Sequence, residues 1–122
     1  MSDEEWRPVV KFEGLYEVSD RGRVRSVDRV IPHRKYGQMN ARGQVLRLRQ
    51  HPDGHLRVNL SESSAVLTRW VHVLVLEAFV GPCPAGMEGC HFDGDPTNNA
   101  LANLRWDTRE GNWRDRKRHA AA

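Results

Sequence analysis

The chain has 122 residues, a length typical of one domain. Hydrophobic residues make up 39% and charged residues 29%, and the chain holds four Trp and three Phe, which together indicate a folded chain rather than a disordered one. No apolar run reaches the roughly 18 residues of a membrane span, and the acidic start MSDEEW is unlike a signal peptide, so we expect a cytoplasmic protein without a membrane partner.

The two cysteines do not predict a zinc knuckle. Cys83 and Cys90 are separated by six residues, and neither belongs to the C-x-x-C pairs that structural zinc sites use. In a reducing compartment both would remain thiols, and Cys83 is expected to be a small buried apolar side chain.

Positive charge is concentrated in one segment. The formal net charge is +3, but residues 20–57 hold ten bases against three acids, while the flanking segments are net negative. Nine of the ten bases are Arg, whose planar guanidinium pairs with phosphate oxygens in a bidentate way. A nucleic-acid backbone is therefore the leading partner, and the alternative is a solvated basic face.

The first part of the chain predicts a β-hairpin. The turn signal at 20–22 is Asp-Arg-Gly, with Tyr16 and Val18 alternating before it and Val24 after it. Residues 31–43, rich in polar residues and Gly, are expected to form an exposed loop. The hairpin would carry along one face the arginines Arg21, Arg23 and Arg25.

The middle of the chain predicts a second hairpin followed by a helix. Strands at 45–49 and 55–60 would flank an Asp-Gly turn at 51–54. Beyond a serine-rich turn, the pattern is strand-like at 66–67 and becomes helical over 71–79. The apolar positions of the hairpin are Leu46, Leu48, Leu56, Val58 and Leu60, and Gly81 is the expected stop of the helix.

Residues 90–112, CHFDGDPTNNALANLRWDTREGN, gather many short polar side chains. An extended segment at 89–92, an Asn-rich turn and a strand at 104–106 are expected, followed by a helix that Thr108 caps and that runs to about His119. The order is strand, polar loop, strand and helix, with His91 at the start and Asn112 in the first helical turn. This arrangement is the ββα-metal motif.

Two stretches of the sequence are similar to known families. The stretch VHVLVLEAFVGPCPAGMEGCHFDGDPTNNALANLRWDTREGN resembles the HNH endonuclease family, in particular the phage and intron-encoded branch with the signature H-x-D-G-x-x-x-N-N, then N-L-x-W, then E-x-N. The stretch EEWRPVVKFEGLYEVSDRGRVRS resembles the small DNA-binding motif that often precedes such nucleases. The resemblance implies an α+β chain with a β-rich DNA-binding region at 1–62 and a nuclease domain at 63–122.

The resemblance also implies roles for individual residues. His91 would be the general base, Asn103 would support the loop that carries His91, and Asn112 would bind one divalent metal ion. In intron-encoded relatives an Asp that serves as a second metal ligand often precedes the base, whereas this chain has Cys90 there. The DNA-binding residues are expected to be Arg21, Arg23, Arg25, Arg47, Arg49 and Arg57.

Cys90 leaves two alternatives for the metal. Either Cys90 is not a ligand and Asp93, Asp107 or Asp115 helps Asn112, or the protein uses a softer ion, because thiols prefer soft metals and Mg²⁺ prefers oxygen ligands. Mg²⁺ or Mn²⁺ is the first expectation, and Ni²⁺ or Zn²⁺ is the alternative.

Other polar residues have structural interpretations. Asn98 and Asn99 are expected to shape the turn, because Asn tolerates the left-handed conformation and bonds its own backbone. Asp93 with Gly94 is expected to shape the same turn. His72 could be structural or could contact phosphate or take part in the chemistry. The remaining histidines, His33, His51, His55 and His119, are expected to be solvated or to face DNA.

The leading hypothesis is a monomeric, metal-dependent endonuclease that cuts double-stranded DNA in the cytoplasm of a cell, a host cell if the protein is phage-encoded. Such chemistry needs a base to activate water and a cation to stabilise charge on the phosphate. The alternative is a DNA-binding module that keeps the HNH scaffold without turnover, and Cys90 is the feature that favours it.

Overall fold

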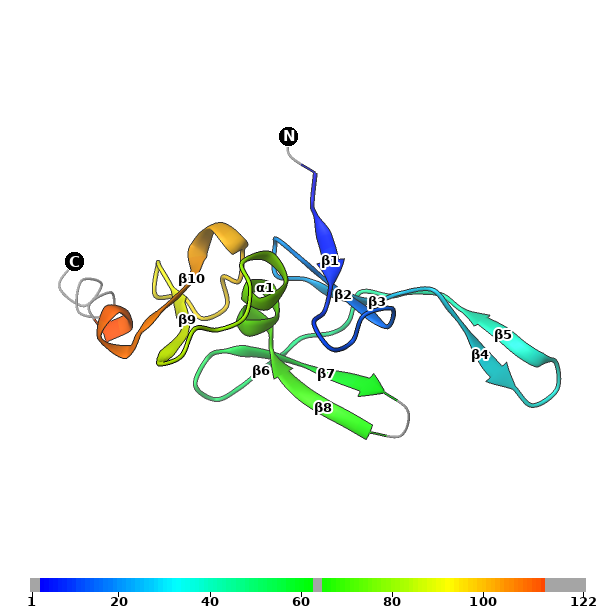
Figure 1. Ribbon diagram of the computed structural model, residues 1–122. Helices are drawn as coiled ribbons and strands as arrows, with labels where there is room; N and C mark the ends of the chain where they lie inside the picture. Colours follow the sequence, from blue (N-terminus) through cyan, green and yellow to red (C-terminus); the bar gives the residue numbers. More distant parts are fainter. Residues whose placement is uncertain (1–2, 63–64, 114–122) are drawn as a thin grey trace.

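The computed structural model describes residues 3–62 and 65–113. In these ranges the chain forms small antiparallel sheets around one α-helix, and it has the predicted α+β organisation (Figure 1). None of the described helices is long and apolar enough to cross a membrane.

The first sheet has the strand order β1 (Trp6–Pro8), β2 (Tyr16–Ser19) and β3 (Val24–Ser26). The predicted hairpin is confirmed, because β2 and β3 pair antiparallel through the turn at 20–22. Gly22 allows the turn by adopting a φ of 85°, a region that favours glycine. The apolar residues that alternate along these strands, Tyr16, Val18 and Val24, are all buried.

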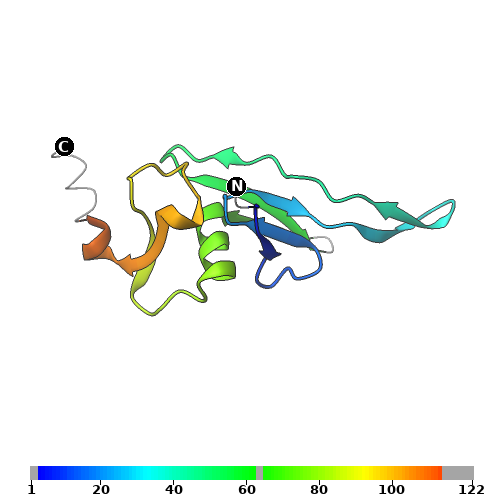
Figure 2. The ribbon, with the colours of Figure 1, turned by 90° about the horizontal axis from the view of Figure 1, so that it is seen from above.

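The loop predicted at 31–43 is instead part of a second hairpin. β4 (Arg29–His33) and β5 (Gly37–Ala41) pair over five residues, and the hairpin extends away from the rest of the molecule (Figure 2). Most of its residues are exposed. The apolar alternation that reveals a strand requires a buried face, and this hairpin has none.

The third sheet has the order β6 (Arg49–Gln50), β7 (Leu56–Glu62) and β8 (Ala65–Trp70). The predicted hairpin exists, but its first strand is shorter than expected because the preceding residues pair elsewhere. Val45 bridges to Arg25, and the Leu46 amide donates to the Val24 carbonyl (2.8 Å). The predicted apolar positions Leu46, Leu48, Leu56, Val58 and Leu60 are all in or against the core.

Helix α1 (Val71–Phe79) begins and ends where the sequence predicts. Val71, Leu74, Val75 and Leu76 are almost fully buried, and α1 packs against β1, β2, β7, β8, β9 and β10. The connection after α1 runs along the surface, so Cys83, expected to be buried, is exposed and its thiol donates to the Met87 carbonyl (3.1 Å). That prediction was wrong because Pro82 and Pro84 keep this segment out of regular structure.

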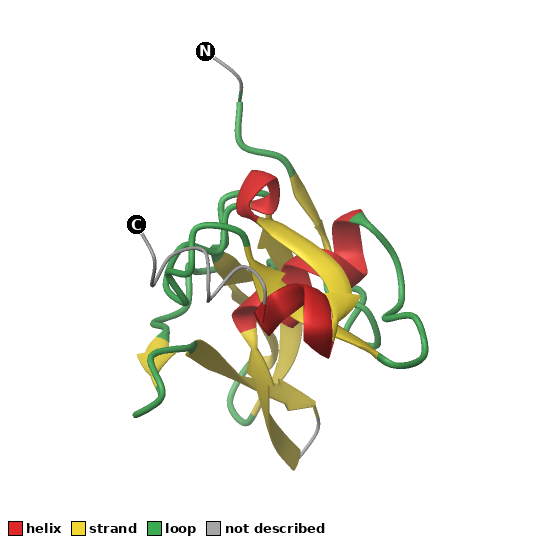
Figure 3. Cartoon of the chain, turned by 90° about the vertical axis from the view of Figure 1, so that its left-hand side faces the viewer, coloured by secondary structure: helices red, strands yellow, loops and turns green. Residues whose placement is uncertain are grey.

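The last described part is the antiparallel pair β9 (Met87–His91) and β10 (Leu104–Thr108), with the short 3-10 helix η1 (Leu101–Asn103) before β10. Residues 109–113 are helical, and the Gly111 amide donates to the Thr108 hydroxyl (3.2 Å), which agrees with the predicted cap. Figure 3 views this side of the molecule, where the helical segments lie among the strands. The rest of the predicted last helix, 114–119, lies outside the described residues.

Candidate active site

His91 is the last residue of β9 and is held by the pairing of β9 with β10. Its register partner is Leu104. Alternation along a strand puts Gly89 and His91 on one face, and this face lies against α1, because a Cβ on Gly89 would lie only 2.6 Å from the His72 ring. Glycine at 89 therefore allows β9 to approach α1 and places His91 beside His72.

The polar partner of His91 is Asn99. The Asn99 Oδ1 lies 2.7 Å from His91 Nε2, and both residues are buried. An amide oxygen only accepts, so the ring proton is on Nε2 and Nδ1 keeps its lone pair. Burial lowers the pKa of His91, against the opposing effect of the Asn99 bond. The imidazole is therefore neutral near pH 7, as a general base requires.

Asn103 organises the loop that follows His91. Its Nδ2 donates to Asp93 Oδ1 and to the Asn98 carbonyl (both 2.9 Å), its Oδ1 accepts from the Asp93 amide (3.1 Å), and its carbonyl accepts from the Phe92 amide (2.8 Å). Hydrogen bonds from Asn98, from the Asp95 backbone and from Asn103 hold the pKa of Asp93 at about 2. These bonds are the kind of loop support that the sequence predicts for Asn103, and they engage Asp93 within the turn.

The rings of His55, His72 and His91 lie close together. The ring centroids of His72 and His91 are 5.0 Å apart, and His55 lies 5.2 Å from His72 and 5.4 Å from His91. Burial, followed by the neighbouring His91 and His55, lowers the pKa of His72 to about 3. His72 Nδ1 has no hydrogen-bond partner in the described part of the chain. His72 is therefore a neutral, packed ring beside the candidate base.

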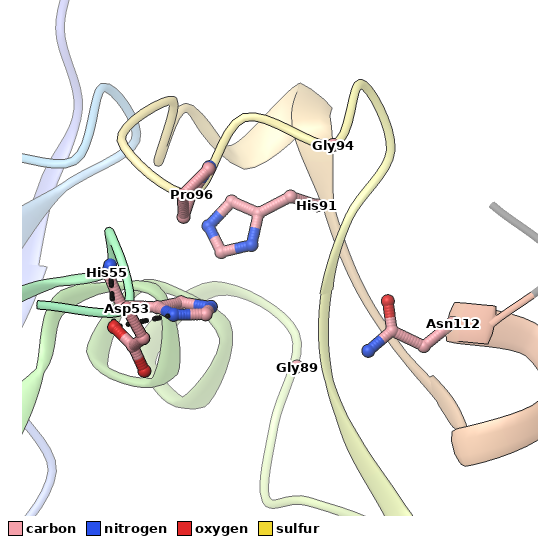
Figure 4. A pocket seen from close by; sticks show the side chains of 7 residues that line it. All are labelled: Asp53, His55, Gly89, His91, Gly94, Pro96 and Asn112. Atoms are coloured by element: carbon pink, nitrogen blue, oxygen red, sulfur yellow. Dashed lines mark hydrogen bonds and ion pairs between the residues drawn. The ribbon is translucent and has the colours of Figure 1, made fainter. Parts of the chain in front are cut away.

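A cavity of about 210 Å³ opens between these elements. It is lined by Asp53, His55, Gly89, His91, Gly94, Pro96 and Asn112. Figure 4 shows the His91 ring entering it from β9, the His55 ring pointing in from the opposite hairpin, and the Asn112 side chain extending from the helical turn. The structure therefore brings His91 and Asn112, far apart in sequence, to one cavity.

Asn112 has a carboxylate partner that the sequence analysis did not name. Its Nδ2 donates to Glu88 Oε1 (2.7 Å). Glu88 and Cys90 share a face of β9, by the same alternation that puts Gly89 and His91 on the other. Cys90 is buried, and its thiol contacts the Glu88 carbonyl oxygen (3.6 Å).

The three carboxylates predicted to help Asn112 lie elsewhere or outside the described residues. Asp93 is bonded within the loop, and Asp107 contacts Arg105 and the Thr108 amide. Asp115 lies outside the described residues. No cluster of three or more His, Cys, Asp or Glu side chains within residues 3–62 and 65–113 could hold a metal ion. Among the described residues, Asp53 and Asn112 bring side-chain oxygens to the cavity lining, and Glu88 reaches Asn112 from β9.

Two of the six predicted DNA-binding arginines have acidic partners. Arg23 forms a two-point ion pair with Glu4, and Arg25 donates to Glu17 from Nε (2.9 Å) and from a terminal nitrogen (2.7 Å). Both guanidinium groups also lie over Trp6, at 5.5 and 4.0 Å from the ring centroid. Hydrogen bonding to Arg23 lowers the pKa of Glu4 to about 2.

The other predicted arginines are differently placed. Arg47 and Arg49 are exposed, and Arg57 is half-buried. Arg49 is the register partner of Arg57, and Arg57 is the register partner of Trp70 on β8. These side chains therefore form a row across the sheet, and the described residues contain no ion-pair partner for Arg47, Arg49 or Arg57. Arg21 is exposed on the 20–22 turn.

The site contains residues that the sequence analysis missed or assigned otherwise. Asn99 was expected only to shape a turn, yet it contacts His91. His55 was expected to be solvated or to face DNA, and Asp53 was only part of a turn, yet both line the cavity. The spacing within the H-x-D-G-x-x-x-N-N stretch carries a signal for Asn99, whereas the approach of 53–55 to His91 depends on tertiary packing.

Comparison with known proteins agrees with this arrangement of elements. Residues 69–114 match the HNH endonuclease family and residues 4–61 match the NUMOD4 motif. The chain is therefore similar to HNH endonucleases over residues 69–114 and to the NUMOD4 motif in the segment before them.

The chain is similar to the DNA endonuclease I-HmuI of Bacillus phage SP01. The two are 32% identical over 108 residues, which is 88% of this chain and 55% of that protein. A solved structure described as DNA binding and cleavage by the HNH homing endonuclease I-HmuI superposes with a TM-score of 0.76 and 30% identity, over 97% of this chain and 60% of that one. The chain therefore spans little more than half the length of this relative.

Proposed function

We propose that the chain is a metal-dependent DNA endonuclease that hydrolyses phosphodiester bonds, with His91 as the general base. The observation that carries this proposal is the buried His91–Asn99 hydrogen bond beside a cavity that Asn112 also lines. The similarity to the phage DNA endonuclease supports DNA as the substrate, which we propose to be double-stranded.

The residues around His91 have distinct proposed roles. His91 Nδ1 takes a proton from a water molecule, and the resulting hydroxide attacks phosphorus as the bond to the 3′ oxygen breaks, which leaves 5′-phosphate and 3′-hydroxyl ends. Asn99 keeps the other ring proton on Nε2, and so keeps the lone pair on Nδ1. Asn103 holds the loop after His91 through Asp93 and Asn98.

Asn112 and Glu88 are the residues that we expect to hold one divalent ion. Their amide and carboxylate oxygens are hard donors from two elements, which suits Mg²⁺ or Mn²⁺, ions that usually keep several waters. When bound, the ion would stabilise negative charge on the phosphate and on the leaving oxygen. The buried Cys90 thiol fits a packing residue better than a ligand of a hard ion, while Ni²⁺ or Zn²⁺ would be the ions that a thiolate ligand favours.

The outer face of the β6–β7–β8 sheet is the proposed DNA-binding surface. Arg47, Arg49 and Arg57 have no acidic partners in the described residues; Arg49 lies on β6 and Arg57 on β7, and Arg47 precedes β6 by two residues. Arg21, Arg23 and Arg25 stay predicted DNA contacts. We propose that a monomer acts in the cytoplasm of a host cell, with a DNA-binding region at 1–62 and a nuclease domain at 63–122.

A plasmid nicking assay with Mg²⁺, Mn²⁺ and Ni²⁺ in parallel tests this function. The parent protein should nick supercoiled DNA, and His91→Ala should lower the rate by a factor of about 10²–10⁴ with little change in DNA affinity. Nicking at the parent rate would remove His91 from the mechanism. DNA binding without nicking under any metal would favour the inactive DNA-binding module, the alternative that Cys90 at the ligand position suggests.

Metal binding is tested separately, by titrating the metal into the protein and following Mn²⁺ by electron paramagnetic resonance. Glu88→Gln should weaken Mn²⁺ binding by about tenfold or more, because it removes a charged oxygen donor. Cys90→Ser should leave Mn²⁺ binding unchanged, and Cys90→Asp should strengthen Mg²⁺ binding by adding a hard oxygen. The opposite pattern, with Cys90→Ser weakening binding and Glu88→Gln not, would assign the ligand role to the thiol.

A further inference from the structure

The turn between β6 and β7 places an Asp–His pair in the cavity. His55 Nδ1 lies 3.2 Å from Asp53 Oδ1, and the His55 backbone amide donates to the same oxygen (3.0 Å). Figure 4 shows the His55 ring pointing from this hairpin into the space that His91 enters from the other side. With Nδ1 facing Asp53, the other ring nitrogen of His55, Nε2, is the one that faces away from Asp53.

The turn that carries this pair is fixed relative to His91. Gly54 has a φ of 101°, and a Cβ there would lie 2.9 Å from Pro96 Cγ, so the turn packs directly on the loop that follows His91. Backbone bonds from Gly54 to the His51 carbonyl and from His51 to the His55 carbonyl (both 2.8 Å) close the turn. His55 therefore has a defined position opposite the candidate base.

The charges around His55 come from three elements. His51 and Asp53 belong to its own turn, His72 to α1 and His91 to β9. Imidazolium groups at such short range repel one another, and the one carboxylate in this group, Asp53, bonds to His55. His55, chiefly through its backbone hydrogen bond, lowers the pKa of Asp53, and it also contributes to the lowered pKa of His72 and of His91. The arrangement keeps the Asp53 carboxylate charged beside the His55 ring and leaves His91 neutral.

His55 also continues the proposed DNA-binding surface. It precedes Arg57 by two residues, so the two side chains leave the chain on the same side where β7 begins. A DNA backbone that follows the row formed by Arg49 and Arg57 would reach the cavity at His55. Phosphate is thus the ligand chemistry that the position of His55, between the arginine row and the cavity, fits.

We propose that His55 is a catalytic residue whose imidazolium form, with Nδ1–H on Asp53, donates a hydrogen bond from Nε2 to an oxygen of the scissile phosphate, and that Asp53 is the residue that positions it. This inference rests on the proposed endonuclease function and deepens it, because it assigns part of the chemistry to the NUMOD4 region. A preorganised donor at the reacting phosphate stabilises charge that grows in the transition state.

Single-turnover nicking and DNA affinity, measured for the same variants, test the inference. His55→Ala should lower the nicking rate at saturating protein by about 10²-fold, with DNA affinity changed less than about threefold. His55→Gln, which keeps an N–H donor without the charge, should recover about tenfold of that loss. Asp53→Asn should lower the rate by about tenfold, because the ring loses the acceptor that orients it.

The matched control is His51→Ala. His51 lies in the same turn, its Nδ1 is 3.0 Å from the same Asp53 oxygen, and its ring packs on Trp70, but it does not line the cavity. Its nicking rate should stay within about twofold of the parent. An equal loss in His51→Ala and His55→Ala would assign the effect to the turn and overturn the role of His55.

A second measurement does not depend on turnover. Titration of the parent protein with inorganic phosphate, and with a metal-free duplex, should shift the imidazole nitrogen resonances of His55 and leave those of His51 in place. Unshifted His55 resonances would overturn the inference. If the parent nicks DNA and His55→Ala nicks equally fast, the inference alone is wrong, whereas a parent that never nicks overturns the proposed function and with it the catalytic role.

Discussion

At the scale of single residues, polar contacts distinguish the two buried histidines of the cluster. His91 and His72 are both buried, and burial is the main cause of the lowered pKa of each. They differ in their polar contacts, because His91 bonds to Asn99 whereas His72 Nδ1 has no hydrogen-bond partner among the described residues. An oriented ring can act as a base, and an unoriented one serves as packing against it.

Asn99 is expected to matter for rate more than for DNA affinity. Asn99→Ala should lower nicking by about 10- to 100-fold, because the His91 ring loses the acceptor that fixes its tautomer. Asn98→Ala is the matched control, since Asn98 is the adjacent Asn of the same turn but bonds Asp93 rather than the base. Single-turnover nicking with both variants checks this. An equal effect of the two would mean that the whole turn, and not the contact with His91, is responsible.

His72 should make stability depend on pH in a predictable direction. Its pKa falls from 6.5 to about 3 on folding, so its contribution is fully present above pH 6.5 and is lost as the pH falls toward 3. At pH 5 this loss amounts to about 2 kcal/mol for one such group. Urea unfolding from pH 7.5 to pH 5 should therefore show a smaller decline for His72→Gln than for the parent. Parallel declines would mean that His72 is protonated without cost.

The sequence predicted His91, Asn103 and Asn112 as the site residues because their spacing resembles a family signature, and the structure places His91 and Asn112 at one cavity and Asn103 in the loop beside it. It did not predict Glu88, because a carboxylate on an exposed strand looks like any solvated charge until its partner is known. The approach of His55 to His91 could not be predicted from the sequence either, because it depends on how two turns pack against each other.

At the scale of elements, the two sets of predicted DNA-binding arginines differ in their partners. Arg23 and Arg25 are held by Glu4 and Glu17, whereas Arg49 and Arg57 lie side by side in register across β6 and β7 and have no acidic partner in the described residues. Like charges side by side on a sheet destabilise it unless an anion lies between them. We therefore expect the β6–β7–β8 face to bind phosphate better than the first sheet does.

Replacing Arg47, Arg49 and Arg57 together with Gln should weaken DNA binding across many sequences. The slope of log K against log salt should become shallower by about two to three units, because a phosphate contact that is no longer made releases no counterion on binding. Arg23→Gln with Arg25→Gln is the comparison, and it should change the slope by less, since those guanidinium groups already have carboxylate partners. Anisotropy titrations over a range of salt measure both slopes, and the reverse order would move the DNA-binding surface to the first sheet.

Periodicity was sufficient to predict α1 and the β2–β3 hairpin, because each of these elements buries one face and so carries the matching apolar repeat. The β4–β5 hairpin buries neither face, and its polar sequence therefore looked like a loop. The difference between the predicted and the observed length of β6 has another cause. Residues 45–46 pair with β3 instead of β7, a choice between two partners that local pattern does not encode.

At the scale of the whole molecule, the two regions that match different families support one site. The buried cluster combines Val18 and Val24 of the first sheet with Leu60 of the third and Leu74 of α1. The turn at 20–22 also reaches the nuclease segment, because the Asp20 carbonyl accepts from the Leu101 amide (2.8 Å). The N-terminal region is thus packed against the loop that carries Asn99.

Gly22 is the position where this support can be tested. A Cβ on Gly22 would lie 2.8 Å from both the Cβ and the carbonyl oxygen of Asn99, so an added methyl must displace Asn99 and with it the hydrogen bond to His91. Gly14 provides a matched control: its φ of 82° resembles the 85° of Gly22, but a Cβ there would meet nothing within 4 Å. Both Gly→Ala changes carry the same left-handed strain, of about 1 kcal/mol.

Only Gly22→Ala should therefore lower the nicking rate, by about 10- to 100-fold at a temperature where both variants remain folded, as an Asn99 substitution would. Thermal unfolding should show a loss of stability in both variants and a larger one in Gly22→Ala, because the clash adds to the strain. Single-turnover nicking beside near-ultraviolet circular dichroism checks the pair. If Gly22→Ala nicks as fast as Gly14→Ala, the N-terminal turn stabilises the fold but does not orient His91.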